Sequence, residues 1–238
     1  MIKDEILLKL QQSKYWDLVT DNNAASNLFI YCGGSRLVGL DSDTSDYDLV
    51  VVRKGTTALF EPHRLKYGDT TIHWYRRNIG NFIKSENASN LILVGLMELS
   101  YVDSSNLMYV SEQGLEVLKI ITDESHNLRQ IGCRKYFKFL KDYAAALVSS
   151  TDIAEKYYSK TLGHLLFASY AVRDEALNKD LIIAAKKCKY NGLTETQRLE
   201  ILKQLRLGLE FIKANEFDEE AEANRIQGLV DEIVGKNV

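Results

Sequence analysis

The sequence predicts an α+β protein, with a small mixed β-sheet and flanking helices followed by an all-α C-terminal region. Two observations support this fold class. Apolar, β-branched and aromatic runs bounded by turn residues, which are typical of strands, occur only in the first part of the chain. After them, apolar residues recur at helical spacing, and the single proline, Pro62, lies far upstream. We therefore expect an α/β domain at residues 1–100 and a helical domain at 101–238 that packs on it.

The α/β part contains one predicted helix and three predicted strands. Apolar residues at helical spacing predict an amphipathic helix over residues 2–19. Strands are predicted where apolar runs end at turn residues or alternate with polar ones, at residues 28–32, 48–53 and 70–75. Gly33 stops the first strand, while Pro62 and Gly68 mark a loop and a turn before the third.

From Ile79 onward the apolar spacing is helical, with a break expected near Asn87. Residues 104–122 show little strand character. Further helices are predicted at residues 127–150, 152–178, 194–214 and 217–234. Thr194 followed by Gln197 is the pattern of a capping box, which marks the start of one of these helices.

The composition is that of a folded protein, with 45% hydrophobic and 26% charged residues. Its net charge of −3 means that a nucleic-acid partner would need a local basic patch. The widely spaced Cys32, Cys133 and Cys188 indicate reduced thiols and no zinc site. A charged N-terminus and the lack of any run of ~18 apolar residues indicate neither a signal peptide nor a membrane span. We expect a cytoplasmic protein with no membrane partner.

One segment, residues 31–52, combines a glycine turn with acidic residues (YCGGSRLVGLDSDTSDYDLVVV). Gly33 and Gly34 allow a tight turn and let the backbone approach a ligand without interference from a Cβ atom. Ser35 adds a hydroxyl and a backbone N–H at the expected start of a helix, which favours a phosphate group. The segment therefore predicts a phosphate-binding turn.

Two aspartates, Asp46 and Asp48, follow Ser35 after a spacer of ten residues. Residues two apart on a strand share a face, so we expect both carboxylates to point the same way. Their charges repel each other, and a divalent cation relieves that repulsion. Carboxylates without His or Cys partners favour Mg²⁺ or Mn²⁺, which also bind substrate phosphates. Turn and aspartates together predict a site for phosphoryl or nucleotidyl transfer.

These residues resemble the DNA polymerase β-like nucleotidyltransferase superfamily, whose members carry a glycine turn, a spacer and Asp-x-Asp or Asp-x-Glu between apolar residues. The segment looks closer still to the predicted nucleotidyltransferases of the bacterial and phage YcgL/RlaP-like group. The motifs shared with that group are Gly34-Ser35-Arg36, Gly39-Leu40 and Ser45-Asp46-Tyr47-Asp48. The close match covers about twenty residues, and a looser one extends to HWYRRNIGNFIKSENASN and KTLGHLLFASYAVRDEAL.

The resemblance implies a nucleotidyltransferase core that moves a nucleoside monophosphate from an NTP to an acceptor hydroxyl on a protein, a small molecule or an RNA. It implies that Asp46 and Asp48 hold Mg²⁺ or Mn²⁺, while Ser35 and the turn amides hold the triphosphate. Arg36 either contacts phosphate or is a solvated helix residue. Lys160, in a later helix that resembles the family, is a candidate for triphosphate binding.

The third strand departs from the superfamily pattern, because no carboxylate stands where the resemblance places a third acid. His73 occupies that position, and a histidine can act as a base or a metal ligand. Asp69, at the start of the strand, is the other candidate. If neither residue acts, the site binds nucleotide with little or no transfer, so a sensor or regulatory module is the alternative function. A helical interaction protein with a coincidental turn is disfavoured by the intact segment.

A basic run lies within the predicted helix at residues 127–150. Arg134, Lys138 and Lys141 share one face at helical spacing, and aromatic residues are interleaved with them. The run is either a solvated face opposite core aromatics or a stripe that binds phosphate or RNA.

Overall fold

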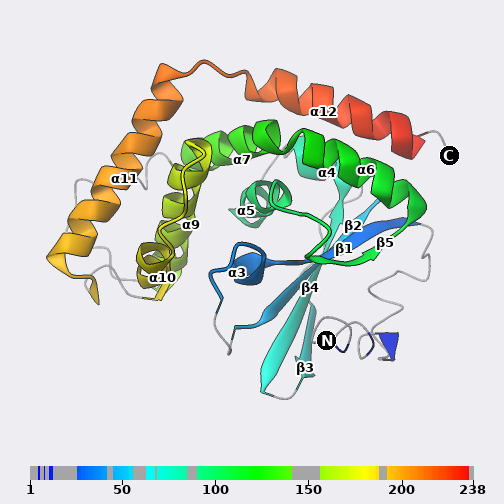
Figure 1. The fold of residues 1–238 in the computed structure, drawn as a ribbon, viewed down its shortest axis with the longest axis horizontal. Coiled ribbons are helices and arrows are strands. Elements are labelled where there is room, and N and C mark those ends of the chain that lie inside the picture. The colour runs from blue at the N-terminus through cyan, green and yellow to red at the C-terminus, as the bar shows by residue number, and fades with distance from the viewer. Residues whose placement is uncertain are drawn as a thin grey trace. The chain divides into compact units, whose positions relative to one another are not determined.

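The computed structural model describes residues 26–41, 45–55, 63–67, 69–84, 90–140, 156–187 and 192–235, together with residues 5, 8, 11 and 12 (Figure 1). The chain divides into two compact units. The first comprises Met1–Asn87, Glu98–His126 and Ala223–Val238, and the second Ala88–Met97 and Asn127–Glu222. These units interleave along the chain, and the division into domains at residues 1–100 and 101–238 stays a prediction.

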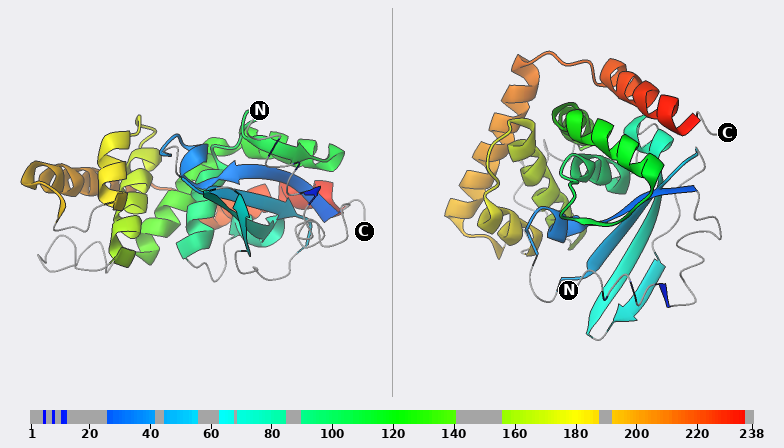
Figure 2. Two further views of the ribbon diagram at one scale, coloured as in Figure 1. Left: turned by 90° about the horizontal axis from the view of Figure 1, so that it is seen from below. Right: turned by 45° about the vertical axis from the view of Figure 1, so that its right-hand side comes forward.

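The first unit is built on a five-stranded sheet with the order β3-β4-β2-β1-β5. The strands are β1 (Asn27–Gly33), β2 (Tyr47–Arg53), β3 (His63–Tyr67), β4 (Thr70–Asn78) and β5 (Leu107–Val110). The pair β2 and β4 is parallel, whereas the other neighbours are antiparallel. The sheet is therefore mixed, as the predicted fold class requires, and Figure 2 shows its twist from two further directions.

The three predicted strands are confirmed as β1, β2 and β4, but the two edge strands were not predicted. β3 lies between Pro62 and Gly68, where the sequence predicts a loop and a turn; its Arg64 and Lys66 are exposed, which hides the strand pattern. The prediction of little strand character over residues 104–122 is wrong for β5, whose four residues are all only partly buried. Short edge strands carry too few buried residues to produce a clear period.

The two faces of the sheet differ in chemistry, because successive side chains of a strand alternate between faces. One face buries an apolar cluster that consists of Ile30, Cys32, Leu49, Val51, Ile72 and Trp74. Full burial of each large apolar side chain stabilises the fold by about 1.5–3 kcal/mol. The alternate positions of the three central strands place polar residues on the opposite face, among them Tyr31, Asp48, His73, Tyr75 and Arg77.

The helices of the first unit are α3 (Gly34–Leu37), α4 (Ile79–Lys84), α6 (Glu112–Asp123) and most of α12 (Glu219–Val234). Helices α6 and α12 run antiparallel, side by side (Figure 1). Gln113 Nε2, at the start of α6, donates to the carbonyl of Ile233 at 2.6 Å. At the other end, both terminal nitrogens of Arg225 donate to the Glu124 carboxylate. These contacts fasten the last helix to this unit.

The second unit is helical. It contains α9 (Lys156–Val172), α10 (Lys179–Lys187), α11 (Glu195–Ala214) and most of α5 (Asn90–Leu99) and α7 (Ser125–Phe139). The capping box of Thr194 and Gln197 is confirmed. The helix predicted at 152–178 ends early, at Val172, and α10 was not predicted. The expected break near Asn87, most of the predicted helix at 2–19 and residues 141–150 lie outside the described residues.

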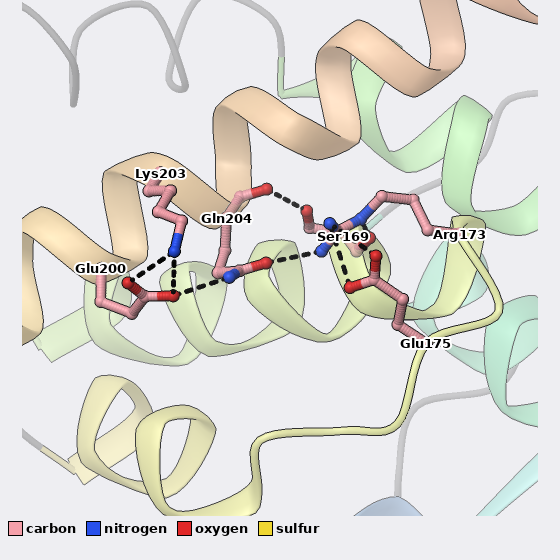
Figure 3. Close-up of polar contacts among 6 residues, drawn as sticks. All are labelled: Ser169, Arg173, Glu175, Glu200, Lys203 and Gln204. Carbon is pink, nitrogen blue, oxygen red and sulfur yellow. Dashed lines mark hydrogen bonds and ion pairs between the residues drawn. The ribbon is translucent and has the colours of Figure 1, made fainter.

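A polar network joins α9 to α11 (Figure 3). The buried Ser169 hydroxyl donates to the carbonyl of Gln204. Arg173 donates to the Ser169 carbonyl at 2.8 Å, to Gln204 Oε1 at 2.6 Å and to Glu175 at 3.0 Å. Gln204 in turn donates to Glu200 at 2.7 Å, and this bond lowers the pKa of Glu200. Each polar group drawn here has a partner, so the network holds the two helices together.

The predicted basic stripe does not form on α7. Arg134 is buried, and it donates to Gln130 Oε1 and to the Ile212 carbonyl, both at 3.2 Å. Lys138 is exposed and pairs with Glu219 at 2.5 Å, while Lys141 lies outside the described residues. Arg134 therefore belongs neither to a solvated face nor to a stripe that binds phosphate or RNA, because the packed helices bury it.

Among the helices that the structure describes, none is both long and apolar enough to cross a membrane.

Candidate functional site

The glycine turn follows directly on β1. Gly33 is the last residue of that strand, and Gly34 has a φ of +66°, a conformation that residues with a side chain rarely adopt. A Cβ atom on Gly34 would overlap the carboxylate of Asp48. Only glycine fits this arrangement, so the turn and the acid are packed against each other.

Ser35 lies in α3, which is a single helical turn of four residues. Its carbonyl accepts a hydrogen bond from the amide of Leu40 at 2.8 Å. The sequence predicts a spacer helix here, but so short a helix has little macrodipole. The attraction of this turn for phosphate would therefore depend on the Ser35 hydroxyl and the turn amides.

Asp48 lies near the start of β2, the central strand of the sheet, and residues of both neighbouring strands lie beside it. It is paired with Gly33 on β1 and with His73 on β4. The Tyr75 hydroxyl donates to Asp48 Oδ1 at 3.2 Å, and His73 Nδ1 lies 3.4 Å from the same oxygen. The other oxygen, Oδ2, faces Gly34. The structure therefore brings the predicted Gly34, Asp48 and His73 together.

Asp46 precedes β2 by one residue, so its placement does not follow from strand alternation alone. Its side chain is exposed, and its Oδ1 accepts a hydrogen bond from the amide of Thr71 at 3.2 Å. That amide belongs to the start of β4, which carries His73 two residues later. Asp46 is thus held at the same end of the parallel strand pair as Asp48.

Arg36 holds the loop that carries Asp46. Its guanidinium donates to the carbonyls of Ser45 and Asp46, at 2.5 and 3.3 Å. It also pairs with Asp41 at 3.0 Å and lies 3.9 Å from the centre of the Tyr47 ring. The sequence predicts that Arg36 either contacts phosphate or is solvated. In the structure its guanidinium instead braces the backbone at Ser45 and Asp46. A direct contact with phosphate would require it to leave these partners.

The two remaining candidates, Asp69 and Lys160, take no part in the contacts described above. Asp69 is an exposed residue of the turn before β4. Lys160 lies on α9 in the second unit, and its side chain is outside the described residues. Roles for these two residues stay predictions.

Further polar residues lie near Asp48, and they are not among the site residues predicted from the sequence. Burial, followed by the charge of Asp48, raises the pKa of Tyr75, so its phenol stays protonated. Burial lowers the pKa of Arg77, and Tyr31, Tyr75 and Glu98 oppose that shift. A Cβ atom on Gly33 would lie 3.4 Å from Glu98 Oε2.

A visible signal for part of this cluster exists in the sequence. Tyr75 and Arg77 continue the alternation that begins at Thr71 and His73, so all four share a face. Glu98 follows β4 by twenty residues, counted from Asn78, and lies in the helix α5. No local pattern predicts that its carboxylate lies near Gly33.

The donors present suit a hard divalent cation. Oδ2 of Asp48 and the second oxygen of Asp46 carry none of the hydrogen bonds described above, and carboxylate oxygens are the donors that Mg²⁺ and Mn²⁺ prefer. Within the described ranges, no three His, Cys, Asp or Glu residues are grouped closely enough to hold a metal by themselves. A bound cation would complete its shell with water and substrate phosphate, as Mg²⁺ commonly does.

Comparison with known proteins adds little to this geometry. No family model matches the chain, and no curated protein matches it. Among solved structures, it is similar to the crystal structure of a nucleotidyltransferase-like protein from Exiguobacterium sibiricum 255-15. That likeness covers 96% of this chain and 74% of that chain, with 11% sequence identity and a TM-score of 0.34. A TM-score this low carries no argument about activity, so the function rests on the site itself.

Proposed function

We propose that this chain is a nucleotidyltransferase, which moves a nucleoside monophosphate from a nucleoside triphosphate to an acceptor hydroxyl. One observation carries the proposal: the turn at Gly34 is packed against the Asp48 carboxylate so closely that no Cβ fits between them. A phosphate-binding turn beside a pair of acids is the equipment that nucleotidyl transfer requires. The resemblance of residues 31–52 to the polymerase β-like superfamily supports the same function.

The chemistry is a displacement at the α-phosphorus. The acceptor oxygen forms a bond to that phosphorus, the bond to the β-phosphate oxygen breaks, and pyrophosphate leaves with the electron pair. The proton of the acceptor hydroxyl passes to a base. Mg²⁺ or Mn²⁺, held by Asp46 and Asp48, would neutralise charge on the triphosphate.

The residues of the turn would orient the triphosphate. The Ser35 hydroxyl and the amides of Gly34 and Ser35 are donors for phosphate oxygens, and Lys160 is the proposed additional cation from the helical region. Arg36 would act indirectly, because it braces the carbonyls of Ser45 and Asp46.

His73 is the proposed base, since it stands where the superfamily carries its third acid. It is the register partner of Asp48, and its Nδ1 lies 3.4 Å from Asp48 Oδ1. An imidazole held beside a carboxylate is oriented for proton transfer through its other nitrogen. Asp69 is the other candidate for this role. The proposal also includes two further points: the acceptor is a protein, a small molecule or an RNA, and the chain is a member of the YcgL/RlaP-like group.

The presence of His73 in place of a third carboxylate also favours a second candidate function. A site with two carboxylates and no third can bind nucleotide and metal while transferring slowly. The chain would then be a sensor or regulatory module with the same cradle.

A labelling experiment separates the two functions. The protein is incubated with α-³²P-labelled NTPs, Mg²⁺ or Mn²⁺ and cell extract, beside the variant Asp46→Asn/Asp48→Asn. The matched control is Glu116→Gln/Glu232→Gln, which removes two exposed carboxylates from the same unit. Label transfer that is lost only in the aspartate variant supports the enzyme.

The other outcomes are equally decisive. Nucleotide binding that requires metal and both aspartates, without label transfer, supports the sensor. Absence of both transfer and binding in the wild type overturns both functions. If transfer occurs, His73→Ala is expected to lower it about 10²- to 10⁴-fold while nucleotide binding is retained.

A further inference from the structure

The hydroxyl of Tyr75 reaches across the sheet to one oxygen of Asp48. We infer that Tyr75 is a positioning residue, whose hydroxyl holds the Asp48 carboxylate with its Oδ2 turned toward the Gly34 turn. This inference rests on the proposed function and names a residue outside the motif that suggested it.

The register of the strands explains why this tyrosine reaches Asp48. Asp48 is paired with His73, and the next residue of β4 on the same face is Tyr75, which is paired with Val50. Tyr75 is therefore the diagonal neighbour of Asp48, a separation that an aromatic side chain can span. Its hydroxyl donates to Asp48 Oδ1 at 3.2 Å.

The two oxygens of Asp48 have different neighbours. Oδ1 faces the donors Tyr75 and His73, whereas Oδ2 faces the glycine turn, where a Cβ atom on Gly34 would overlap it. Rotation of the carboxylate would move Oδ1 away from the Tyr75 hydroxyl and break this bond. The hydroxyl of Tyr75 therefore selects one orientation, with Oδ2 presented to the turn.

The ring of Tyr75 is itself supported by Arg77. Arg77 is a residue only 6% exposed, and its guanidinium carbon lies 5.4 Å from the centre of the Tyr75 ring. The charge of Glu98 acts on Arg77 and on Tyr75, so these three residues form one electrostatic cluster. A tyrosine packed against a buried cation has few rotamers, which makes it a firm support for Asp48.

Tyr31 supplies a matched control on the same face of the sheet. It is fully buried on β1, and within the described part of the chain its hydroxyl has no hydrogen-bond partner. The same burial, together with Glu98, raises its pKa as burial raises that of Tyr75. Of these two tyrosines, Tyr75 donates to Asp48 and Tyr31 does not, so they differ in the feature under test.

The experiment compares Mn²⁺ affinity in the full-length wild type, Tyr75→Phe, Tyr31→Phe and Asp46→Asn/Asp48→Asn. Mn²⁺ binding is measured by electron paramagnetic resonance in the presence of a non-hydrolysable ATP analogue. Loss of a residue that orients a metal ligand commonly lowers affinity about 10- to 100-fold. We expect Tyr75→Phe to bind Mn²⁺ about tenfold more weakly, and Tyr31→Phe to bind like the wild type.

The outcomes separate this inference from the proposed function. Wild-type binding that requires the two aspartates, with equal affinity in Tyr75→Phe, overturns the inference and leaves the function standing. Equal losses in Tyr75→Phe and Tyr31→Phe also overturn it, because the effect would then come from the core. No aspartate-dependent Mn²⁺ binding in the wild type overturns the function and the inference together.

A second measurement covers the case in which Tyr75→Phe does not fold, as judged by circular dichroism. Replacement of Tyr75 by 3-fluorotyrosine keeps the hydroxyl and places a ¹⁹F nucleus beside it. We expect its resonance to shift on Asp48→Asn and on addition of the diamagnetic Mg²⁺ with nucleotide. A resonance that ignores both changes would show that the hydroxyl does not bind Asp48.

Discussion

Two polar clusters of this protein differ in how their charged groups are paired. In the helical unit, Arg173 is shared among Ser169, Gln204 and Glu175, and the network joins α9 to α11. At the sheet, Asp46 accepts a backbone amide, while Asp48 lies between a phenol and an imidazole. No Lys or Arg among the described residues forms an ion pair with either aspartate.

The difference separates a structural cluster from a candidate site. A network whose charges and hydrogen bonds are matched internally needs no further partner and stabilises the fold. Two acids that no described Lys or Arg neutralises repel each other, and a metal ion with its substrate can relieve that repulsion. Changes in the helical network should therefore alter stability, whereas changes around the aspartates should alter binding.

Among the changes that test this comparison of the two clusters, the largest effect is expected from Gly34→Ala. The new Cβ would overlap the Asp48 carboxylate, and the φ of +66° would strain alanine. Displacement of a catalytic group by about 1 Å can cost about a hundredfold in rate, so transfer should fall by that factor, measured by ³²P labelling.

The control for that change is Gly55→Ala, because Gly55 also has a positive φ, +103°, but open space around it. Backbone strain alone should cost about 1–2 kcal/mol of stability there and leave transfer intact. Undiminished transfer in Gly34→Ala would show that the packing of Gly34 against Asp48, on which the proposed function rests, is not needed for transfer.

Gly208→Ala should act on the helical unit instead. Its Cβ would lie 3.0 Å from Cβ of Ser169 and would overlap the Ser169 hydroxyl. Overpacking of this kind costs about 1–3 kcal/mol, to be measured by thermal or urea unfolding. Gly228→Ala is the control, since that glycine of α12 has nothing within 4 Å and should gain stability or lose none. Loss of Mn²⁺ affinity in folded Gly208→Ala would contradict the division of roles between the clusters.

Arg36→Lys should have a moderate effect on the candidate site. A lysine cannot reproduce the fork that binds the carbonyls of Ser45 and Asp46 and pairs with Asp41. Loss of about one hydrogen bond, worth about 1 kcal/mol, should weaken Mn²⁺ binding about fivefold. Arg225→Lys, which alters the exposed pair with Glu124, should leave that affinity unchanged. An Mn²⁺ affinity in Arg36→Lys that is equal to or higher than that of the wild type would refute the role of Arg36 as a brace.

The smallest effect is expected from Lys203→Ala. Lys203 lies at the solvent edge of the helical network, 63% exposed, and pairs with Glu200 at 3.3 Å. Pairs this exposed contribute less than about 1 kcal/mol, so the midpoint of unfolding should hardly move. A loss comparable to that of Gly208→Ala would mean that the network depends on its exposed charges.

Much of the candidate site could be predicted because it is local in the chain. The glycine turn, the aspartates and the strands β1, β2 and β4 follow from residue type and alternation over short stretches. Alternation also places His73 on the face of Asp48, and the register confirms them as partners.

Other features escaped because packing overrides local pattern. β3 and β5 are stabilised by pairing with a neighbouring strand, not by a buried period of their own. Arg134 looked like part of a surface stripe, yet it is enclosed, since a buried glutamine and a helix-end carbonyl accept its hydrogen bonds. A charged residue inside a helix bundle cannot be recognised before its acceptors are known.

By itself the sequence determined the fold class, the glycine turn and the two aspartates, because these depend on neighbours along the chain. The tertiary structure decided which groups face them. It placed Tyr75 on Asp48, turned Arg36 toward the loop of Asp46 and brought Glu98 beside Gly33. Such contacts depend on strand register and helix packing, and the periodicity of a single segment contains neither.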